Sequence, residues 1–436
     1  MAVNCGRNDI VRIDIEKLVS SIKDAPMSSK CCIFKTPIIL RRINEQAYVP
    51  DAFSIGPFHH GDRKLRDTQS IKIKYFKGLI SRSHFPEQIL RNLINSVMEV
   101  EKEARECYAW PTDYVMEVEK EACECYAWPI DYEPNDFVKI LVIDGCFIIE
   151  LLRKFTYPNL KEEDDPIFNK FCMKKFLLHD LILLENQVPW MVLTRLFNLT
   201  TGPEHRHPLS ELAINYFSSI FSLSPPYIHS TCIEDIKHIP DLLRKWMISS
   251  IHEEVEGSPL SSETIPSATS LDEAGMKLIM RESRSILDIK FDKGVLEIPP
   301  LLINDTTEAA FRNLISFEQC YPKCPARSTS YATFIDRLIN SAKDAELLGK
   351  YKIVENWLSP DDAAQLFNKL YLNNNVNENY YQSLSRDLNS YCNQRWPRWR
   401  AGLVRNYFNT PWAILSTIAT AMLLILAFVQ TWYTVI

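Results

Sequence analysis

The stretch DFVKILVIDGCFIIELLRKF, residues 136–155, decides the fold. Apolar side chains fall on nearly every face of a helix of this length, and a helix that is hydrophobic all round is buried inside a protein. A second stretch of the same character, FCMKKFLLHDLILLENQVPWMVLTRLFNL, spans residues 171–199. Because two central helices need other helices to cover them, the sequence predicts a mainly α, multi-helical globular body.

Shorter stretches on both sides have the apolar spacing of amphipathic helices. They cover residues 9–24, 68–82, 87–110, 307–320, 331–348, 361–371 and 377–393. The stretch ILDIKFDKGVLEIPPLLI (286–303) instead has β-rich arms around a glycine turn and predicts a minor β-hairpin. A polar stretch rich in serine and proline, 253–270, predicts a linker or surface loop. We expect one body over residues 1–405, built as two lobes folded together.

Composition narrows the classes of function. The 436 residues carry a net charge of -6, which speaks against nucleic-acid binding, and 46% of them are hydrophobic, which is ample for a core. The twelve cysteines are scattered without the paired spacing of a zinc site, so buried, reduced cysteines are expected. No phosphate loop, nucleophile elbow or kinase signature occurs. The sequence therefore predicts no catalytic residue, metal or cofactor.

The C-terminus contains an apolar segment that predicts a membrane anchor over residues 406–436. No charged residue occurs from Trp412 to Val429. Trp412 and Trp432 are twenty residues apart, and a helix rises about 1.5 Å per residue, so the two rings lie about 30 Å apart. This is the thickness of the hydrocarbon core of a bilayer, with an aromatic ring at each interface. The pattern predicts a single-pass helix.

The charges beside the anchor predict its orientation. Arginines precede it and no lysine or arginine follows it, which favours a cytoplasmic body with a few residues across the membrane. These arginines, interleaved with tryptophan, would also suit an anionic lipid surface; they are Arg395, Arg398, Arg400 and Arg405. Two glycosylation sequons, at Asn198 and Asn304, argue for the opposite orientation. The sequence does not name the membrane.

The stretch SIGPFHHGDRKL (54–65) contains adjacent histidines behind a Gly56-Pro57 turn. His59 and His60 are neighbours in the chain, and no third ligand lies within a helical turn, so a metal site is not predicted. We interpret the stretch as a surface turn organised by Gly56 and Pro57.

Polar residues end two apolar runs just before a proline. Glu185, Asn186 and Gln187 precede Pro189, where polar side chains can cap freed helix carbonyls and fix the direction of the next helix. The same pattern is weaker near Pro322, where two polar side chains end an apolar run; they are Glu318 and Gln319. We interpret both as buried polar joints.

Residues 97–114, VMEVEKEARECYAWPTDY, are repeated at once as VMEVEKEACECYAWPIDY (115–132). The two copies differ only where Arg105 becomes Cys123 and Thr112 becomes Ile130. Pro111 should stop a helix near the end of the first copy. The repeat predicts a tolerated tandem duplication beside the core.

Several long motifs together resemble one family. They are YVPDAFSIGPFHHG, VIDGCFIIEL with Asp144 and Gly145, LLHDLILLENQVPW, LEIPPLLINDTTEAAFRNLISFEQC and the C-terminal YFNTPWAILSTIATAMLLILAFVQTWYTVI. From about residue 10 to the end, the chain resembles the plant domain-of-unknown-function 247 proteins, also called uncharacterised protein family 0481. The resemblance implies a plant protein with one helical domain, a C-terminal membrane helix and no established activity. The first copy of the repeat matches the family pattern at Arg105, which the second copy lacks.

Three functions remain open at this stage. The first is a membrane-anchored interaction or signalling component whose body binds an unknown protein partner. The second is an enzyme with an unfamiliar site built from the His59/His60 turn and Glu185–Gln187. The third is a lipid-surface scaffold that acts through residues 395–405. Convergence of His59, Glu185 and a third polar group in an open pocket would favour the enzyme.

Overall fold

The computed structural model describes most of the chain. The described residues are 30–109, 132–202, 207–221, 234–249, 258–259, 265–283, 285–321, 324–356, 358–370, 378–394, 397, 399–400 and 411–435. The expected helix at 9–24, nearly all of the second repeat copy and much of 253–270 lie outside them. The prediction of a mainly α body with a minor β element is confirmed.

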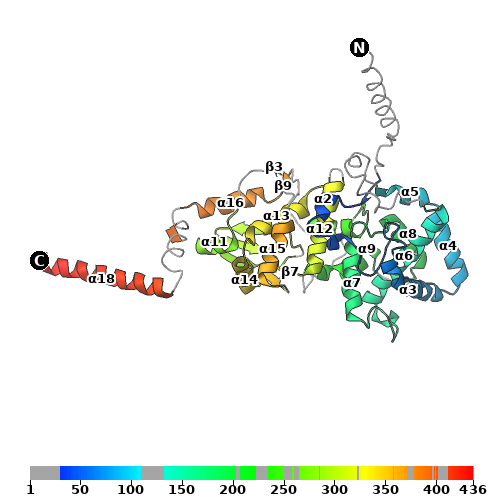
Figure 1. Cartoon of the computed structure of the whole chain (residues 1–436), viewed down its shortest axis with the longest axis horizontal. Helices are drawn as coiled ribbons and strands as arrows, with labels where there is room; N and C mark the ends of the chain where they lie inside the picture. The colour runs from blue at the N-terminus through cyan, green and yellow to red at the C-terminus, as the bar shows by residue number, and fades with distance from the viewer. Residues whose placement is uncertain are drawn as a thin grey trace, which may run out of the picture.

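Helix α6 (Pro134–Thr156) is the centre of the first half of the body, as the stretch 136–155 predicts. Other helices surround it on several sides (Figure 1). They are α3 (Gln69–Ser81), α4 (Pro86–Met98), α5 (Glu101–Glu106), α8 (Trp190–Thr200) and α9 (Leu209–Phe217). Gly145 permits the close approach of α6 and α8, because a Cβ there would lie 2.5 Å from Leu196 Cδ1.

Helix α12 (Asp305–Cys320) has the same role in the second half of the body, where it is buried along most of its length. It contacts the first half through α7 (Phe171–Ile182) and α10 (Ile239–Ser249). Further helices of this half pack on it or on one another; they are α11 (Ala268–Glu273), α13 (Arg327–Leu338), α14 (Ala342–Lys350) and α15 (Pro360–Leu370). Helix α16 (Gln382–Cys392) instead contacts the strand β5 (Lys290–Asp292). One continuous hydrophobic core joins both halves.

The expected hairpin is present as β5 (Lys290–Asp292) and β6 (Val295–Ile298), joined by Lys293 and Gly294. Both turn residues have positive φ, as a tight hairpin turn requires. Short parallel pairings between distant segments are not evident from the sequence. They join β4 (Lys277–Met280) to β6, β7 (Leu301–Ile303) to β8 (Val354–Asn356), and β1 (Ile33–Phe34) to β2 (Tyr108–Ala109). An antiparallel pairing between distant segments joins β3 (Ser258–Pro259) to β9 (Glu378–Asn379).

Several predicted helix bounds are wrong. The stretch 171–199 forms two helices, α7 and α8, because the chain between Leu183 and Pro189 turns through the polar joint. The stretch 87–110 breaks at Val100 into α4 and α5 and ends in β2, and 331–348 breaks after Leu338 into α13 and α14. In 377–393 the first residues form β9 before α16 begins at Gln382.

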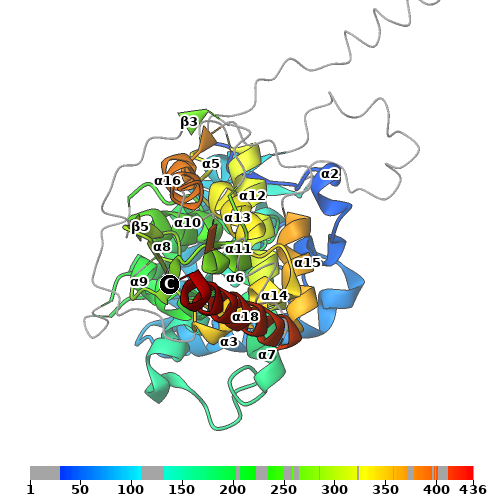
Figure 2. The same ribbon diagram turned by 90° about the vertical axis from the view of Figure 1, so that its left-hand side faces the viewer.

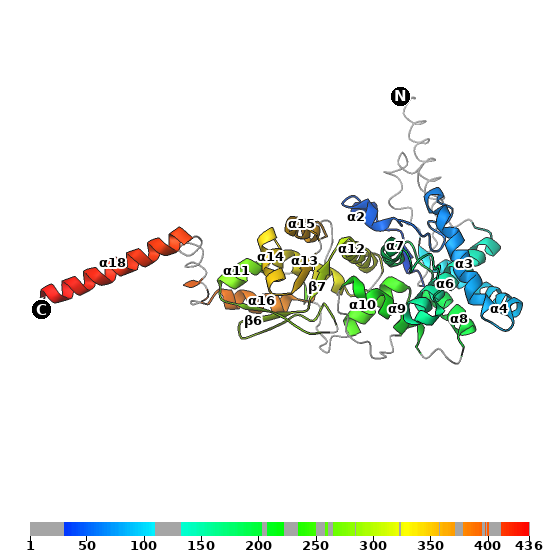
Figure 3. The ribbon, with the colours of Figure 1, turned by 90° about the horizontal axis from the view of Figure 1, so that it is seen from below.

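Helix α18 (Pro411–Val435) lies apart from the body and projects from its end (Figures 1, 2 and 3). It is long and apolar enough to cross a membrane, and none of the window from Leu415 to Trp432 is buried against the described part of the chain. The side chains of Leu424 and Phe428 are 66% and 70% exposed.

Candidate functional site

The loop formed by residues 51–57 is enclosed by polar side chains from α6, from the end of α7 and from the joint that follows α7. Asp180, at the end of α7, holds the start of this 51–57 loop. Its carboxylate accepts the backbone N–H of Asp51 at 2.7 Å, of Ala52 at 2.9 Å and of Phe53 at 2.7 Å. A buried backbone without regular structure must bond to side chains, and here a single carboxylate satisfies three donors.

Asn186 and Gln187 hold the loop and the adjoining helices together. The Asn186 side chain accepts the N–H of Ile55 at 2.6 Å and donates to the carbonyl of Phe53 at 2.9 Å. The Gln187 amide donates to the freed carbonyls of Leu181 and Leu183 at 2.7 and 2.8 Å. Its oxygen accepts the N–H of Ile239 at 3.2 Å, at the start of α10. The structure thus places both residues as a buried polar joint between α7, α8, α10 and the loop.

Asp144 on α6 binds the other end of the loop. It accepts the N–H of Gly56 at 2.9 Å and pairs with the Lys72 ammonium at 2.5 Å, while Lys72 also donates to the carbonyl of Ser54 at 2.7 Å. Both charged side chains are buried. Burial raises the pKa of Asp144, and Lys72 acts against this rise.

Gly56 occupies a position that no other residue fits. Its φ is 70°, in the left-handed region, and a Cβ there would lie 2.2 Å from the carbonyl oxygen of Gln187. Tyr108 donates to the same oxygen at 3.0 Å. The Gly56-Pro57 turn is therefore buried rather than superficial, which corrects the expected surface turn.

Glu185 lies beside this joint in a cluster of ionisable groups. Its carboxylate accepts the N–H of Thr36 at 2.7 Å, pairs with Arg41, and lies 3.7 Å from His59 Nε2. The side chains of Glu185, Arg41 and His59 are 3%, 12% and 16% exposed. Burial lowers the pKa of His59 and of nearby Lys35. His59 and Glu185 do converge, in a largely buried ion-pair cluster.

His60 faces another part of the molecule. Its ring meets Tyr132 edge-on at 5.8 Å, and its carbonyl accepts the Tyr132 hydroxyl at 3.1 Å. Burial lowers the pKa of His60 as well. The two histidines therefore do not share one site.

Glu318 belongs to a separate joint. Its buried carboxylate accepts the backbone N–H groups of Ser328 and Thr329, each at 2.8 Å, and the Thr329 hydroxyl at 2.7 Å. It thereby caps the N-terminus of α13, where a negative charge is favoured. Burial raises the pKa of Glu318. Gln319 lies on the exposed side of α12.

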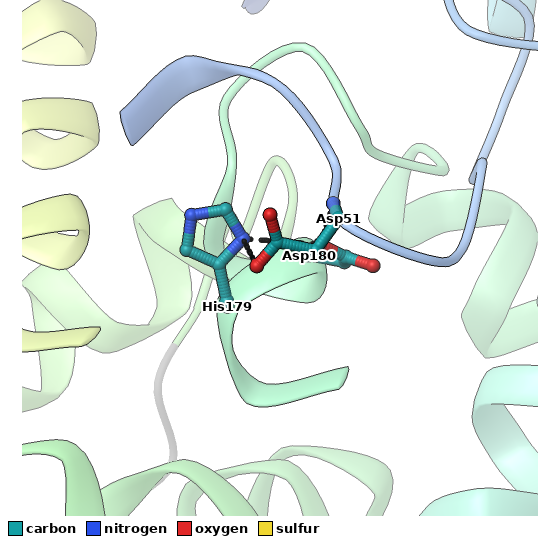
Figure 4. A group of neighbouring side chains, drawn as sticks. All are labelled: Asp51, His179 and Asp180. Atoms are coloured by element: carbon teal, nitrogen blue, oxygen red, sulfur yellow. Dashed lines mark hydrogen bonds and ion pairs between the residues drawn. The ribbon is translucent and has the colours of Figure 1, made fainter. Parts of the chain in front are cut away.

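Among the described residues, one group of side chains has the composition of a metal site: Asp51, His179 and Asp180 (Figure 4). His179 Nδ1 lies 3.0 Å from Asp180 and 3.5 Å from Asp51. The Asp180 oxygens, however, already accept three backbone N–H groups, whose positive ends would face a cation. The geometry favours a loop clamp over a metal ligand.

The residues expected at the membrane interface are only partly described. Arg395, Arg398 and Arg405 lie outside the described residues. Arg400 donates to the carbonyls of Asp272 and Glu273, each at 2.5 Å, at the end of α11. Trp412 is the second residue of α18, and Trp432 near its other end is 59% exposed. Arg400 therefore connects the stretch before the anchor to the body.

The motifs that build this site are those that carry the family resemblance, and a comparison of the whole chain agrees. The model of a family described as plant protein of unknown function, DUF247, matches residues 33–426. The chain belongs to the DUF247 family. The Arabidopsis thaliana UPF0481 protein At3g47200 is 26% identical over 92% of this chain and 85% of its own length. A second Arabidopsis thaliana UPF0481 protein, At3g02645, is 20% identical over 91% of this chain and 89% of its own. No solved structure matches.

Three members of the site in this DUF247 chain are missing from the sequence predictions: Thr36, Arg41 and Lys72. Asp180 is different, because an acid inside an apolar helix must find donors, and the sequence favours a satisfied buried pair of His179 with Asp180 over a catalytic one. Lys72 carries no such signal, since Lys74 and Lys77 on the same helix look alike in sequence. Only the fold distinguishes them.

We expect Glu185→Ala to lower the free energy of unfolding by about 2–3 kcal/mol, since it leaves the Thr36 N–H and the Arg41 guanidinium without their acceptor. Urea unfolding of the detergent-solubilised full chain, followed by tryptophan fluorescence, measures this. His59→Ala is the matched control and should lose less, because no hydrogen bond joins His59 to Glu185 in the described structure. Unchanged stability in Glu185→Ala would assign the carboxylate to binding or catalysis instead.

Proposed function

We propose that this chain is a membrane-anchored interaction protein: α18 crosses a bilayer and holds the helical body on the cytoplasmic face, where the body binds a protein partner. The observation that supports this most directly is α18 itself. A helix of 25 residues is about 37 Å long, enough to span the hydrocarbon core, and its apolar side chains are exposed along the described window. Such a surface favours lipid over water.

The polar chemistry of the body supports interaction over catalysis. Asp144, Asp180, Asn186 and Gln187 each bond to backbone groups of the same chain. The two acids also bond to side chains of the same chain, Asp144 to Lys72 and Asp180 to His179. A catalytic acid or base must reach a substrate. One specific observation favours the enzyme alternative: His59 approaches Glu185 within a cluster that includes Arg41.

The two glycosylation sequons are the argument against a cytoplasmic body, and their places in the fold weaken it. Asn198 lies within helix α8, and the Asn304 side chain accepts the N–H of Thr307 at 2.9 Å as the cap of α12. Acceptor sites for glycosylation are expected in surface loops, and neither sequon lies in one. The arginine bias before α18 then favours the cytoplasmic orientation.

We expect deletion of residues 406–436 to move the protein from the membrane pellet to the soluble fraction with its body folded. The full chain should stay in the pellet after high-salt and alkaline washes, since its binding is hydrophobic. Fractionation followed by circular dichroism of the released protein measures this. A truncated protein that still pellets, although folded, would contradict the anchor.

Orientation has its own test. A sequon appended after Ile436 should be glycosylated in microsomes, while Asn198 and Asn304 stay unmodified and added protease digests the body. Glycosylation of the native sequons with protection of the body would reverse the topology.

A further inference from the structure

Three cysteines from two distant segments gather where β1 and β2 begin. Cys31 and Cys32 directly precede β1, and Cys107 directly precedes β2. All three are buried and carry free thiols. The parallel register that pairs Ile33 with Tyr108 brings Cys32 beside Cys107 one step earlier, and the Cys107 carbonyl accepts the Cys32 N–H at 2.9 Å.

This placement has the geometry of a disulfide. Neighbouring strands lie about 4.8 Å apart, which falls within the range of Cα separations that a disulfide bridges. Residues paired across parallel strands direct their side chains to the same face of the sheet. The backbone contact fixes this proximity, because the Cys107 carbonyl also accepts the Ile33 N–H at 2.8 Å. The Cys107 thiol itself donates to the carbonyl of Glu103 at 3.4 Å. Cys31 is displaced, with its sulfur 3.8 Å from the Cys107 carbonyl oxygen.

We propose that Cys32 and Cys107 form a reversible disulfide site that reacts with low-molecular-weight disulfides such as oxidised glutathione. The disulfide would link the segment that begins strand β1 covalently to the first copy of the repeat, residues 97–114. Cys107 is the entry point because it is 7% exposed, against 1% for Cys32.

Neighbouring Cys32 lowers the pKa of Cys107, and Lys237 and Lys30 act in the same direction against burial. Thiolate character at the more exposed sulfur favours its attack on an external disulfide.

The reaction balances in two exchange steps. The Cys107 thiolate attacks one sulfur of the small disulfide, whose S–S bond breaks and whose other half leaves as a thiolate. The Cys32 thiol then loses its proton, and its sulfur attacks the Cys107 sulfur of the mixed disulfide. The second half of the small molecule leaves, so two protein thiols are oxidised and one small disulfide is reduced to two thiols.

The test uses the detergent-solubilised full chain incubated with oxidised glutathione, followed by alkylation, trypsin and mass spectrometry. Trypsin cuts after Lys30 and Lys35, so Cys31 and Cys32 share the peptide 31–35, while cuts after Arg105 and Lys120 place Cys107 in 106–120. The related cysteines of the second copy, Cys123 and Cys125, fall in the separate peptide 121–139.

We expect a linked peptide pair of 31–35 with 106–120, joined at Cys32 by fragment ions and absent after dithiothreitol. Intact protein should lose two hydrogen masses. In Cys32→Ser the reaction should stop at a glutathione adduct on Cys107, and Cys107→Ser should form no link. The control is Cys172, an exposed free thiol outside this cluster. The variant Cys172→Ser should behave as the native chain.

Three results would overturn the proposal: a native chain that stays reduced or stops at glutathione adducts, a link through Cys31, or a link to 121–139. Because the peptide map of the native chain decides among them, a variant that fails to fold does not weaken the test.

Discussion

Replacing Gly56 with alanine should destabilise the protein more than any other substitution considered. The new Cβ would lie 2.2 Å from the carbonyl oxygen of Gln187, a backbone atom that the α7–α8 joint holds in place, and φ at 70° is strained for any side chain. Overpacking against backbone and left-handed strain together cost about 3–5 kcal/mol. A typical domain has only about 5–15 kcal/mol of stability, so this substitution would remove a large share of it.

The chain supplies a matched control in Gly61. Its φ is 89°, and no heavy atom lies within 4 Å of a Cβ built there, so Gly61→Ala introduces the strain without the collision. Yield of folded full chain and urea unfolding of both variants make the comparison. Equal losses in the two would show that the turn, and not the contact with Gln187, decides the requirement for glycine.

Lys72→Met should be the second most damaging substitution. It removes the ammonium that neutralises Asp144, and that carboxylate is 1% exposed. Loss of one partner of a buried ion pair costs about 3–5 kcal/mol. Urea unfolding of the full chain measures the loss, and Lys74→Met on the same helix is the control. Lys74 pairs with Glu162 and Asp164 at the surface, where ion pairs contribute little.

A double variant separates charge from packing. Adding Asp144→Leu to Lys72→Met removes the stranded carboxylate and should recover part of the stability. Full recovery is not expected, because the Gly56 N–H then loses its acceptor. A double variant less stable than Lys72→Met alone would show that Asp144 stabilises the loop even without its partner.

A long apolar pattern was sufficient to predict α6, but not residues 171–199, which form α7 and α8 because the polar joint divides them. Residues 136–155 correspond to α6, and the hairpin at 290–298 follows from β-rich arms around Lys293 and Gly294. The polar residues at 185–187 were also recognisable, since three polar side chains before a proline interrupt an apolar run.

The features that the sequence did not predict depend on contacts between distant segments. The strands β4, β7 and β8 are three or four residues long and gain their partners only through the fold. The 51–57 loop has no periodic pattern, so nothing local indicates that Asp180, Asn186 and Asp144 would enclose it. The convergence of His59 with Glu185 is similarly a product of the fold, because the two residues lie far apart in the chain.

The way side chains enclose the 51–57 loop also has a consequence for synthesis on the ribosome. Asp51 bonds to Asp180 across 129 residues, and Ile55 bonds to Asn186 across 131. At a synthesis rate of about 5–20 residues per second, the ribosome needs roughly 6–26 s to make that intervening length. During this time the N–H groups of Asp51 and Ile55 have no native acceptor. Until α7 and the polar joint emerge from the ribosome, water must satisfy the hydrogen bonds of these N–H groups.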